Sequence, residues 1–344
     1  MTERAVSHPV HLVGSIPFSD TSAVLEVVAE TLGDRVYRIP DGETGDRTNW
    51  IAWQLSKLAQ SEQLELASSR DTDYAASMPQ LHIRDDCMAS DVELGDLGYR
   101  AAALASYREF AAMKAAGDIK RDCRFQVSLP TPLAPIHFYV DPADQAPLEG
   151  VYEEALLAEL EAIVAEIPAS ELAVQWDTAV EFGILEGVFP TFLPDPEPDI
   201  VDRLVKLGTA VPAEVQLGYH LCYGDSGHRH FIEPIDTSKL VSLANQIAHG
   251  LSRSLQWVHL PVPKSRTDDD YYRPLSSLSL PAETRLFLGL IHFSDGLSGA
   301  ESRIEVAKRY VQNFGVATEC GFGRRPPETV LELLELHASA CEFL

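Results

Sequence analysis

The sequence predicts an α/β protein whose strands and helices close into a (β/α)8 barrel. Short apolar runs rich in β-branched residues alternate with amphipathic stretches of helical length, and about eight such units follow one another. A length of 344 residues suits a closed barrel of this kind. No linker or composition break divides the chain, so we expect one domain over residues 1–344. No G-x-G-x-x-G follows the first strand, which argues against a dinucleotide-binding sheet.

The first half of the chain contains four expected strands and four expected helices. The strands, identified by short apolar runs, are Val10–Ser15, Arg35–Ile39, Phe125–Leu129 and Leu172–Trp176. The helices are Thr21–Leu32, a stretch from Trp50 towards Gln60, Tyr99–Ala115 and Val151–Ile167. Asp20 or Thr21 caps the first helix, and leucines at helical spacing define the last. A less regular insertion, through residue 95, separates the second and third strands.

The second half repeats this alternation more regularly. Strands are expected at Val215–Cys222, Leu255–Leu260, Arg285–Ile291 and Val316–Glu319. Helices are expected at Ser238–Leu251, Ser298–Phe314 and Pro327–Cys341.

Charge and cysteine content narrow the class of protein. The net charge of −25 has no basic counter-patch, which argues against nucleic acid and against an anionic membrane as partners. No run approaches the roughly 20 apolar residues that span a bilayer, and the first residues lack the pattern of a secretory signal. Five widely spaced cysteines do not form a disulfide framework, so we expect a cytoplasmic protein. A homo-oligomer is an open alternative to a monomer.

Polar residues gather at the predicted carboxyl ends of the strands, where barrels of this class place their active sites. The candidates for catalysis are Asp177, His259 and His292. The candidates for contact with a small-molecule substrate are Ser15, Asp41, Glu43, Arg47, Trp176 and Asp295. Structural alternatives stay open: Asp177 could cap a helix, His292 could bind backbone, and Asp41–Arg47 could be an ordinary turn.

His220-Leu221-Cys222 is the sharpest local pattern. Alternate residues of a strand point to the same side, so the imidazole and the thiol can reach one ion. Cys320 follows the last predicted strand and offers a third ligand of a type that zinc accepts. We therefore expect a Zn²⁺ site formed by His220, Cys222 and Cys320. The nearby pair His228 and His230 falls in an apparent loop and is expected at the surface.

The motifs around these three residues resemble a known family. His220-Leu-Cys-Tyr, followed by Glu-Cys320-Gly-Phe-Gly-Arg-Arg, is similar to the zinc site of the C-terminal barrel of cobalamin-independent methionine synthase and of the epoxyalkane:coenzyme M transferases. Val13–Pro17 is similar to the family's opening Ile-Gly-Ser-Phe-Pro, and Val174–Asp177 to its Gln-x-Asp-Glu-Pro. Residues 45 to 120 have no match. The superfamily also contains uroporphyrinogen decarboxylase, which shares the barrel without this metal site.

The resemblance implies that zinc activates a substrate thiol for methyl or alkyl transfer, with one coordination position left open. The sequence departs from the family in three places. His259 stands where the family has a glutamate, so it is either a fourth ligand or a general base. The acidic pair after the fourth strand is reduced to Asp177, and His292-Phe-Ser-Asp295 replaces Asp-Ile-His-Ser.

Two other functions stay open on the sequence alone. One is a metal-free lyase or decarboxylase of the uroporphyrinogen decarboxylase kind, in which Asp41, Asp177 and the histidines serve as acid and base. The other is a barrel that binds a small molecule without catalysis. Within the zinc hypothesis itself, both a transferase and a lyase acting on a thiol or an oxyanion are compatible with the motifs.

Overall fold

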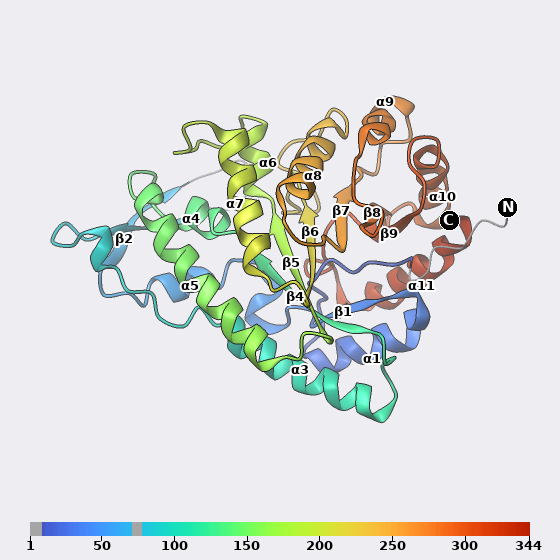
Figure 1. The fold of residues 1–344 in the computed structure, drawn as a ribbon, viewed down its shortest axis with the longest axis horizontal. Coiled ribbons are helices and arrows are strands. Elements are labelled where there is room, and N and C mark those ends of the chain that lie inside the picture. The colour runs from blue at the N-terminus through green and yellow to red at the C-terminus, as the bar shows by residue number, and fades with distance from the viewer. Residues whose placement is uncertain (1–8, 71–77) are drawn as a thin grey trace.

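A parallel sheet runs through the middle of the protein, with helices around its outside (Figure 1). The computed structural model describes residues 9–70 and 78–344. The first eight residues, for which the sequence predicts no secretory signal, lie outside this range. The sheet has the order β1-β4-β5-β6-β7-β8-β9. Its strands are β1 (Arg38–Pro40), β4 (Arg124–Pro130), β5 (Leu172–Thr178), β6 (Gln216–Leu221), β7 (Trp257–Pro261), β8 (Arg285–Ile291) and β9 (Phe314–Thr318).

Residues 10–15 connect the two edges of this sheet. Val10 forms parallel bridges with Val36, just before β1, and with Val316 in β9. Farther along, Ser15 forms a parallel bridge with Gly42. The predicted first strand therefore occupies the eighth position, although its pairing consists of isolated bridges. The (β/α)8 prediction is confirmed.

The helices surround the sheet. They are α1 (Thr21–Leu32), α2 (Gln54–Leu58), α3 (Tyr99–Ala116), α4 (Leu133–Tyr139), α5 (Gln145–Glu166), α6 (Val180–Leu185), α7 (Pro196–Ala210), α8 (Ser238–Gly250), α9 (Asp269–Tyr272), α10 (Gly296–Ala307) and α11 (Val330–Ala340). Helix α1 has the predicted bounds, and the Asp20 carboxylate accepts a hydrogen bond from Ala23 N at 2.9 Å. Helices α4, α6, α7 and α9 were not among the predicted elements.

Three predicted helices have clearly different bounds. Helix α5 begins at Gln145, six residues before the predicted Val151. The helix expected from Trp50 towards Gln60 begins only at Gln54, because Trp50 has φ 51°, outside the helical region. The helix expected to reach Phe314 ends at Ala307, and Phe314 is the first residue of β9. Asn313, with φ 58°, reverses the chain between the two elements.

The predicted insertion between the second and third barrel strands is a hairpin. Strands β2 (Leu64–Arg70) and β3 (Met78–Ile83) pair antiparallel and lie at the left edge of Figure 1. Leu81 forms a bridge with Val140, which follows α4. The hairpin is thereby attached beside the barrel, where its first β3 residues reach the cavity described below.

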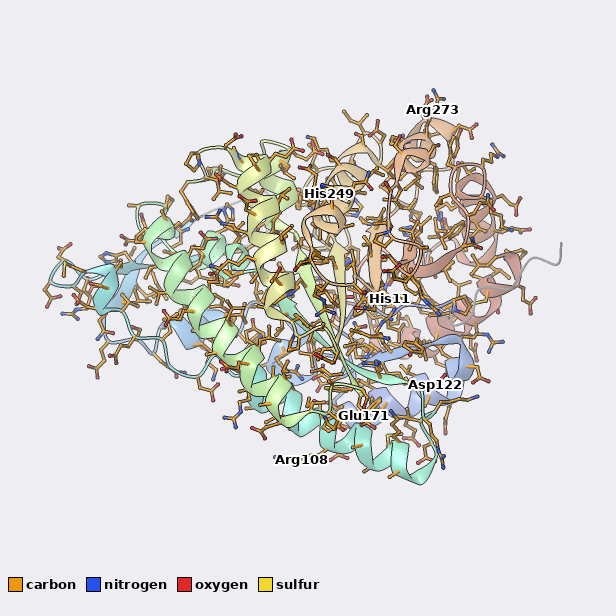
Figure 2. The ribbon with its side chains drawn as sticks, in the orientation of Figure 1. His11, Arg108, Asp122, Glu171, His249 and Arg273 are labelled. Carbon is orange, nitrogen blue, oxygen red and sulfur yellow. The ribbon has the colours of Figure 1, made fainter. Side chains whose placement is uncertain are left out.

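The barrel interior is polar in its middle layer. Gln175 in β5 donates to Val13 O at 2.6 Å and accepts hydrogen bonds from Trp257 Nε1 and the His11 ring. Figure 2 shows His11 among the strands, whereas His249 and Arg273 lie on the periphery. Because these buried polar groups have partners, the interior avoids the cost of unpaired donors and acceptors.

Trp257 fills the barrel below this layer. Its partner in the neighbouring strand is Gly218, where an added Cβ would lie 1.9 Å from the indole ring. The guanidinium of buried Arg38 stacks on the indole at 3.9 Å, and burial lowers the pKa of Arg38 to about 9. Trp257, two residues before His259 on β7, is thus packed between Gly218 and the Arg38 guanidinium.

Among the described residues, no helix is both long enough and apolar enough to cross a membrane.

Glu181 in α6 is buried, and both oxygens of its carboxyl group accept hydrogen bonds. Thr131 donates a hydrogen bond to Oε1, and Ala179 N donates to Oε2 at 3.0 Å. Burial raises the pKa of Glu181 to about 7, because a charge in this position loses its hydration.

We expect this group to make the protein less stable as the pH rises. The folded state holds the Glu181 proton up to about pH 7, whereas the unfolded chain releases it near pH 4.5. Stability is therefore lost between these values, by about 3 kcal/mol at about 1.4 kcal/mol per pKa unit. Thermal unfolding of Glu181→Gln from pH 4 to pH 8 should lack this loss. The exposed control Glu301→Gln should lose stability with rising pH as the wild type does. If stability falls equally with pH in the wild type and in both variants, the assignment to Glu181 is wrong.

Candidate metal and substrate site

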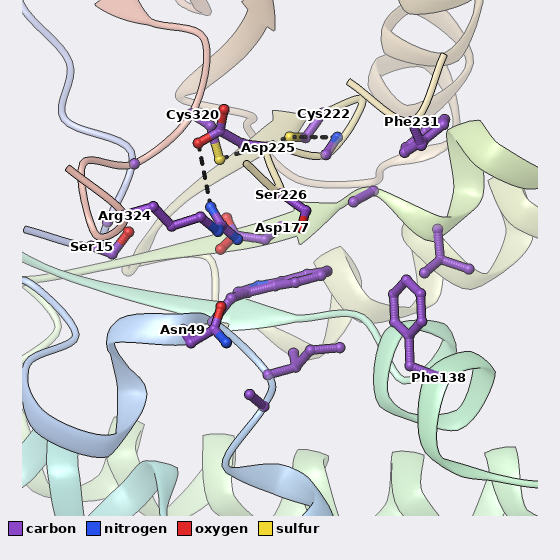
Figure 3. Close-up of a pocket in the computed structure, with 18 of the residues that line it drawn as sticks. Ser15, Asn49, Phe138, Asp177, Cys222, Asp225, Ser226, Phe231, Cys320 and Arg324 are labelled. Atoms are coloured by element: carbon purple, nitrogen blue, oxygen red, sulfur yellow. Dashed lines mark hydrogen bonds and ion pairs between the residues drawn. The ribbon is translucent and has the colours of Figure 1, made fainter. Parts of the chain in front are cut away.

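Three predicted ligands meet at the carboxyl end of the barrel. His220 lies near the end of β6, Cys222 directly follows β6, and Cys320 follows β9 (Figure 3). One ligand atom from each lies within 4.8 Å of the other two, and the two sulfurs are 3.9 Å apart. The alternation of side chains along β6 explains why His220 and Cys222 face the same way. Within the described part of the chain, these three residues form the one such group found.

His259 lies behind His220 and outside this group. The Nδ1 atoms of the two rings are 2.6 Å apart, and the rings stack with their centroids separated by 4.7 Å. Burial lowers the pKa of both rings, that of His259 to about 3, so both imidazoles are neutral at pH 7. Nε2 of His220 is buried without a hydrogen-bond partner. This leaves one nitrogen of His220 free to coordinate a metal while the other contacts His259.

The thiol groups of Cys222 and Cys320 contact each other. Cys222 donates a hydrogen bond to Cys320, which raises the pKa of Cys222 and lowers that of Cys320. A second hydrogen bond runs to the Cys222 sulfur from Gly224 N at 3.3 Å. A neutral imidazole nitrogen and two sulfurs, one of them biased towards thiolate, match the donor set that zinc prefers. The residues therefore fit a zinc ion.

A cavity of about 450 Å³ opens in front of the three ligands. Its polar end contains Ser15, Glu43 and Asp177 from the predicted set, together with Asp225 and Arg324. Arg324 donates to Asp225 at 3.3 Å, which connects the loop after β6 to the loop after β9 (Figure 3). This is the size range of pockets that enclose small molecules.

Three carboxyl groups line this cavity, those of Glu43, Asp177 and Asp225, and burial raises the pKa of each. Burial, and then the charge of Asp41, raises the pKa of Glu43 to about 7. Burial and the nearby Glu43 raise the pKa of Asp177 well above its ordinary value, although Gln175 donates to it at 2.8 Å. Asp177 is thus the predicted acid that both reaches the cavity and favours its protonated form.

Ser15 shapes the loop that carries Cys320. Its carbonyl accepts from Phe322 N at 2.6 Å, and its hydroxyl accepts from Gly323 N at 3.2 Å. A Cβ on Gly321 would lie 2.3 Å from the Ser15 hydroxyl oxygen. A glycine next to Cys320 is therefore required for this close approach.

Asp41 and Arg47 pair with each other outside the cavity lining. Arg47 contacts the Asp41 carboxylate at 2.8 Å, and Ser106 donates to the same carboxylate at 3.0 Å. The other Asp41 oxygen accepts from Glu43 N at 2.8 Å. The pair thus fixes the loop that presents Glu43 to the cavity, and substrate contact by Asp41 and Arg47 stays a prediction.

Three further candidates also lie outside the cavity lining. Trp176 is fully buried and points away from Asp177 because neighbouring strand residues face opposite sides. The His292 ring bonds Val262 O at 2.9 Å, and burial lowers its pKa to about 3. Asp295 pairs bidentately with Arg303, which is 1% exposed. Their placement favours structural roles.

Glu319 links two histidines beside the ligand group. It lies 3.3 Å from His230 and 3.3 Å from His292, and burial raises its pKa to about 8. The surface position expected for His230 is wrong: its side chain is 4% exposed, because the loop after β6 folds inward over Glu319. His228 is exposed, as predicted.

The cavity contains residues that sequence reasoning did not single out. Arg324 follows Cys320 by four positions and Asp225 follows Cys222 by three, so proximity to the ligands was an available signal. Asn49 and the aromatic side chains Trp50, Phe138, Phe189 and Phe231 come from loops and from helix α4. No local pattern marks them as lining one cavity.

Two solved structures share the fold of this chain. A B12-independent methionine synthase from Shewanella sp. W3-18-1, in complex with selenomethionine, has a TM-score of 0.61 at 12% identity, over 98% of this chain and 97% of that one. A methyltransferase from Methanosarcina mazei has a TM-score of 0.54 at 13% identity, over 97% and 94%. No family model matches the sequence. Among curated proteins, no relative matches it either.

We expect Asp295 to contribute to stability and not to ligand binding. Asp295→Asn removes the charge that compensates buried Arg303, so the free energy of unfolding should fall by about 2 kcal/mol. Denaturant unfolding measures this loss. Asp270→Asn, which breaks an exposed pair with Arg273, should change stability by less than about 0.5 kcal/mol. If Asp295→Asn is as stable as the wild type, the structural role is wrong and Asp295 is again a candidate for substrate contact.

Proposed function

We propose that this protein is a zinc-dependent transferase that activates the thiol of a small molecule for methyl or alkyl transfer. The observation that carries the proposal is the group of His220, Cys222 and Cys320, with ligand atoms within 4.8 Å of one another at the end of a substrate-sized cavity. Three protein ligands leave one coordination position for an exchangeable group, which is the arrangement of catalytic zinc sites. The fold shared with a methionine synthase and a methyltransferase supports the same reading.

Zinc held by these residues would lower the pKa of a coordinated substrate thiol and leave it nucleophilic at neutral pH. The protein's own groups would then orient the reaction. His259 holds the His220 ring through the 2.6 Å contact at Nδ1, which leaves Nε2, a buried atom without a hydrogen-bond partner, to serve as the ligand. Protonated Asp177, positioned by Gln175, can donate a proton to a leaving group in the cavity.

The proposal requires zinc in the purified protein. Protein prepared without a polyhistidine tag should contain about one zinc ion per chain, measured by atomic emission. Cys222→Ser and Cys320→Ser should each lose most of this zinc, because a hydroxyl does not replace a thiolate ligand. Cys87→Ser, whose thiol lies outside the ligand group, should retain it.

A thiol gives a second measurement on the same proteins. Addition of 2-mercaptoethanol to the zinc-loaded wild type should release protons, because a thiol loses its proton when it becomes a ligand. The two ligand variants should release none. Full turnover of a substrate without any metal would instead favour the acid–base lyase, with Asp177 as its acid.

His259 should tune the metal site from behind His220. His259→Leu removes the partner of Nδ1, so zinc affinity should fall by about 10- to 100-fold in competition with a chelating dye. His259→Gln retains a hydrogen-bonding group and should recover part of the lost zinc affinity. The exposed control His249→Asn should bind zinc as tightly as the wild type. X-ray absorption that detects two imidazole nitrogens on the zinc would contradict this role and make His259 a ligand.

A further inference from the structure

The cavity has a second, apolar end away from the charged residues. Phe138 and Phe231 lie on the opposite side of Figure 3 from Arg324 and Ser15. The cavity is also lined by apolar side chains that are only partly buried, namely Trp50, Met78, Phe138, Phe189 and Phe231. Partly buried aromatic surface in an enclosed space is stabilised when an apolar group covers it.

The aromatic rings of this end are held in fixed positions. Phe138 meets Phe189 edge to face, with centroids 5.9 Å apart, and Phe231 lies 5.0 Å from Phe189. On its far side Phe189 stacks on His137 at 4.8 Å. Gly183 provides the space, since a Cβ there would lie 2.1 Å from the Phe189 ring. The rings therefore form a preorganised wall.

Trp50 adds an independent observation. Its backbone has φ 51° and ψ −107°, a conformation that is unfavourable for a bulky residue. Strain of this kind costs about 1–3 kcal/mol and is found where a side chain must be held for function. The strained position places the indole in the cavity lining, next to Asn49 and Ile51, which also line it.

The charged groups of the cavity lie at its other end. Asp177, Asp225 and Arg324 lie on the side of Cys320 in Figure 3. Glu43 also lines the cavity and is close enough to Arg324 for its charge to act on the Glu43 carboxyl group. A carboxylate or another anion placed among the aromatic rings would lose its hydration without gaining a partner from their faces. An aromatic ring in the same place would gain ring contacts of the kind that Phe189 already makes with Phe138 and with Phe231.

We propose that the substrate thiol carries an aromatic body, with its sulfur at the Cys222–Cys320 end and its ring against Phe138, Phe189 and Phe231. This inference rests on the proposed function, because it assigns the sulfur to the metal site. The strand ends then supply the chemistry, and the loops together with the β2–β3 insertion select the substrate. Aryl-alkyl thiols are the class that this cavity accepts, in preference to small or amino-acid thiols.

The test compares two thiols on the zinc-loaded full chain. Phenylmethanethiol and 2-mercaptoethanol are titrated calorimetrically, and the ratio of their dissociation constants is the readout. We expect phenylmethanethiol to bind at least about tenfold more tightly, as expected for burial of one ring. In Phe189→Ala the ratio should fall by about tenfold, and Phe231→Leu is a milder variant should the first fail to fold. Phe18→Ala, a partly buried phenylalanine outside the cavity lining, should keep the wild-type ratio.

Each outcome separates this inference from the function on which it rests. If both thiols bind the zinc protein with equal affinity, the aromatic substrate is wrong and the zinc-thiol function stands. If the ratio is high but is unchanged in Phe189→Ala and in Phe231→Leu, the ring binds elsewhere and the inference also fails. If neither thiol binds, the proposed function fails and the inference fails with it.

Discussion

The side-chain amide of Gln175 connects the closure of the barrel to its cavity. It donates to the Val13 carbonyl, in a segment that pairs with the sheet only through isolated bridges, and to the carboxyl of Asp177. Its oxygen accepts from Trp257 and contacts the His11 ring. Loss of such a group leaves several buried polar atoms unpaired at once, which costs more than any single bond. Gln175 therefore links the position of Asp177 to the closure of the barrel, to which Gln126 also contributes through the Leu12 and Val13 carbonyls.

The barrel divides its tasks between strand ends and loops. His220, Cys222, Asp177 and Cys320 lie at or just beyond the ends of strands whose hydrogen-bonded register fixes them. The aromatic end of the cavity comes from parts that the strands do not constrain: the segment before α2, helix α4 and the loops after α6 and β6. In (β/α)8 barrels an arrangement of this kind allows the groups at the strand ends to be retained while ligand preference changes with the loops.

The parts of the site that follow strand periodicity could be predicted from the sequence. The two-residue spacing of His220 and Cys222 fixes their shared side, and the regular alternation of elements brings Cys320 to the same end. The role of His259 could not be predicted, because its contact with His220 depends on the register of β6 against β7. The pairs Asp41–Arg47 and Asp295–Arg303 depend on loop and helix geometry that no local pattern encodes. Helix α7 did carry a signal, with Ile200, Leu204 and Leu207 at helical spacing and a proline at its start.

The cavity lining carries less negative charge than the net charge of −25 would suggest. Burial raises the pKa of Glu43 to about 7 and that of Asp177 well above its ordinary value, so these carboxyl groups hold protons that surface acids release. The charge of Glu43 further raises the pKa of Asp177, and the cationic Arg324 lies on the same lining. A ligand therefore needs no ammonium group to enter this acidic protein. That electrostatic balance is compatible with the proposed substrate, a neutral thiol with an apolar body, which under the proposal would lose its proton only at the three ligands.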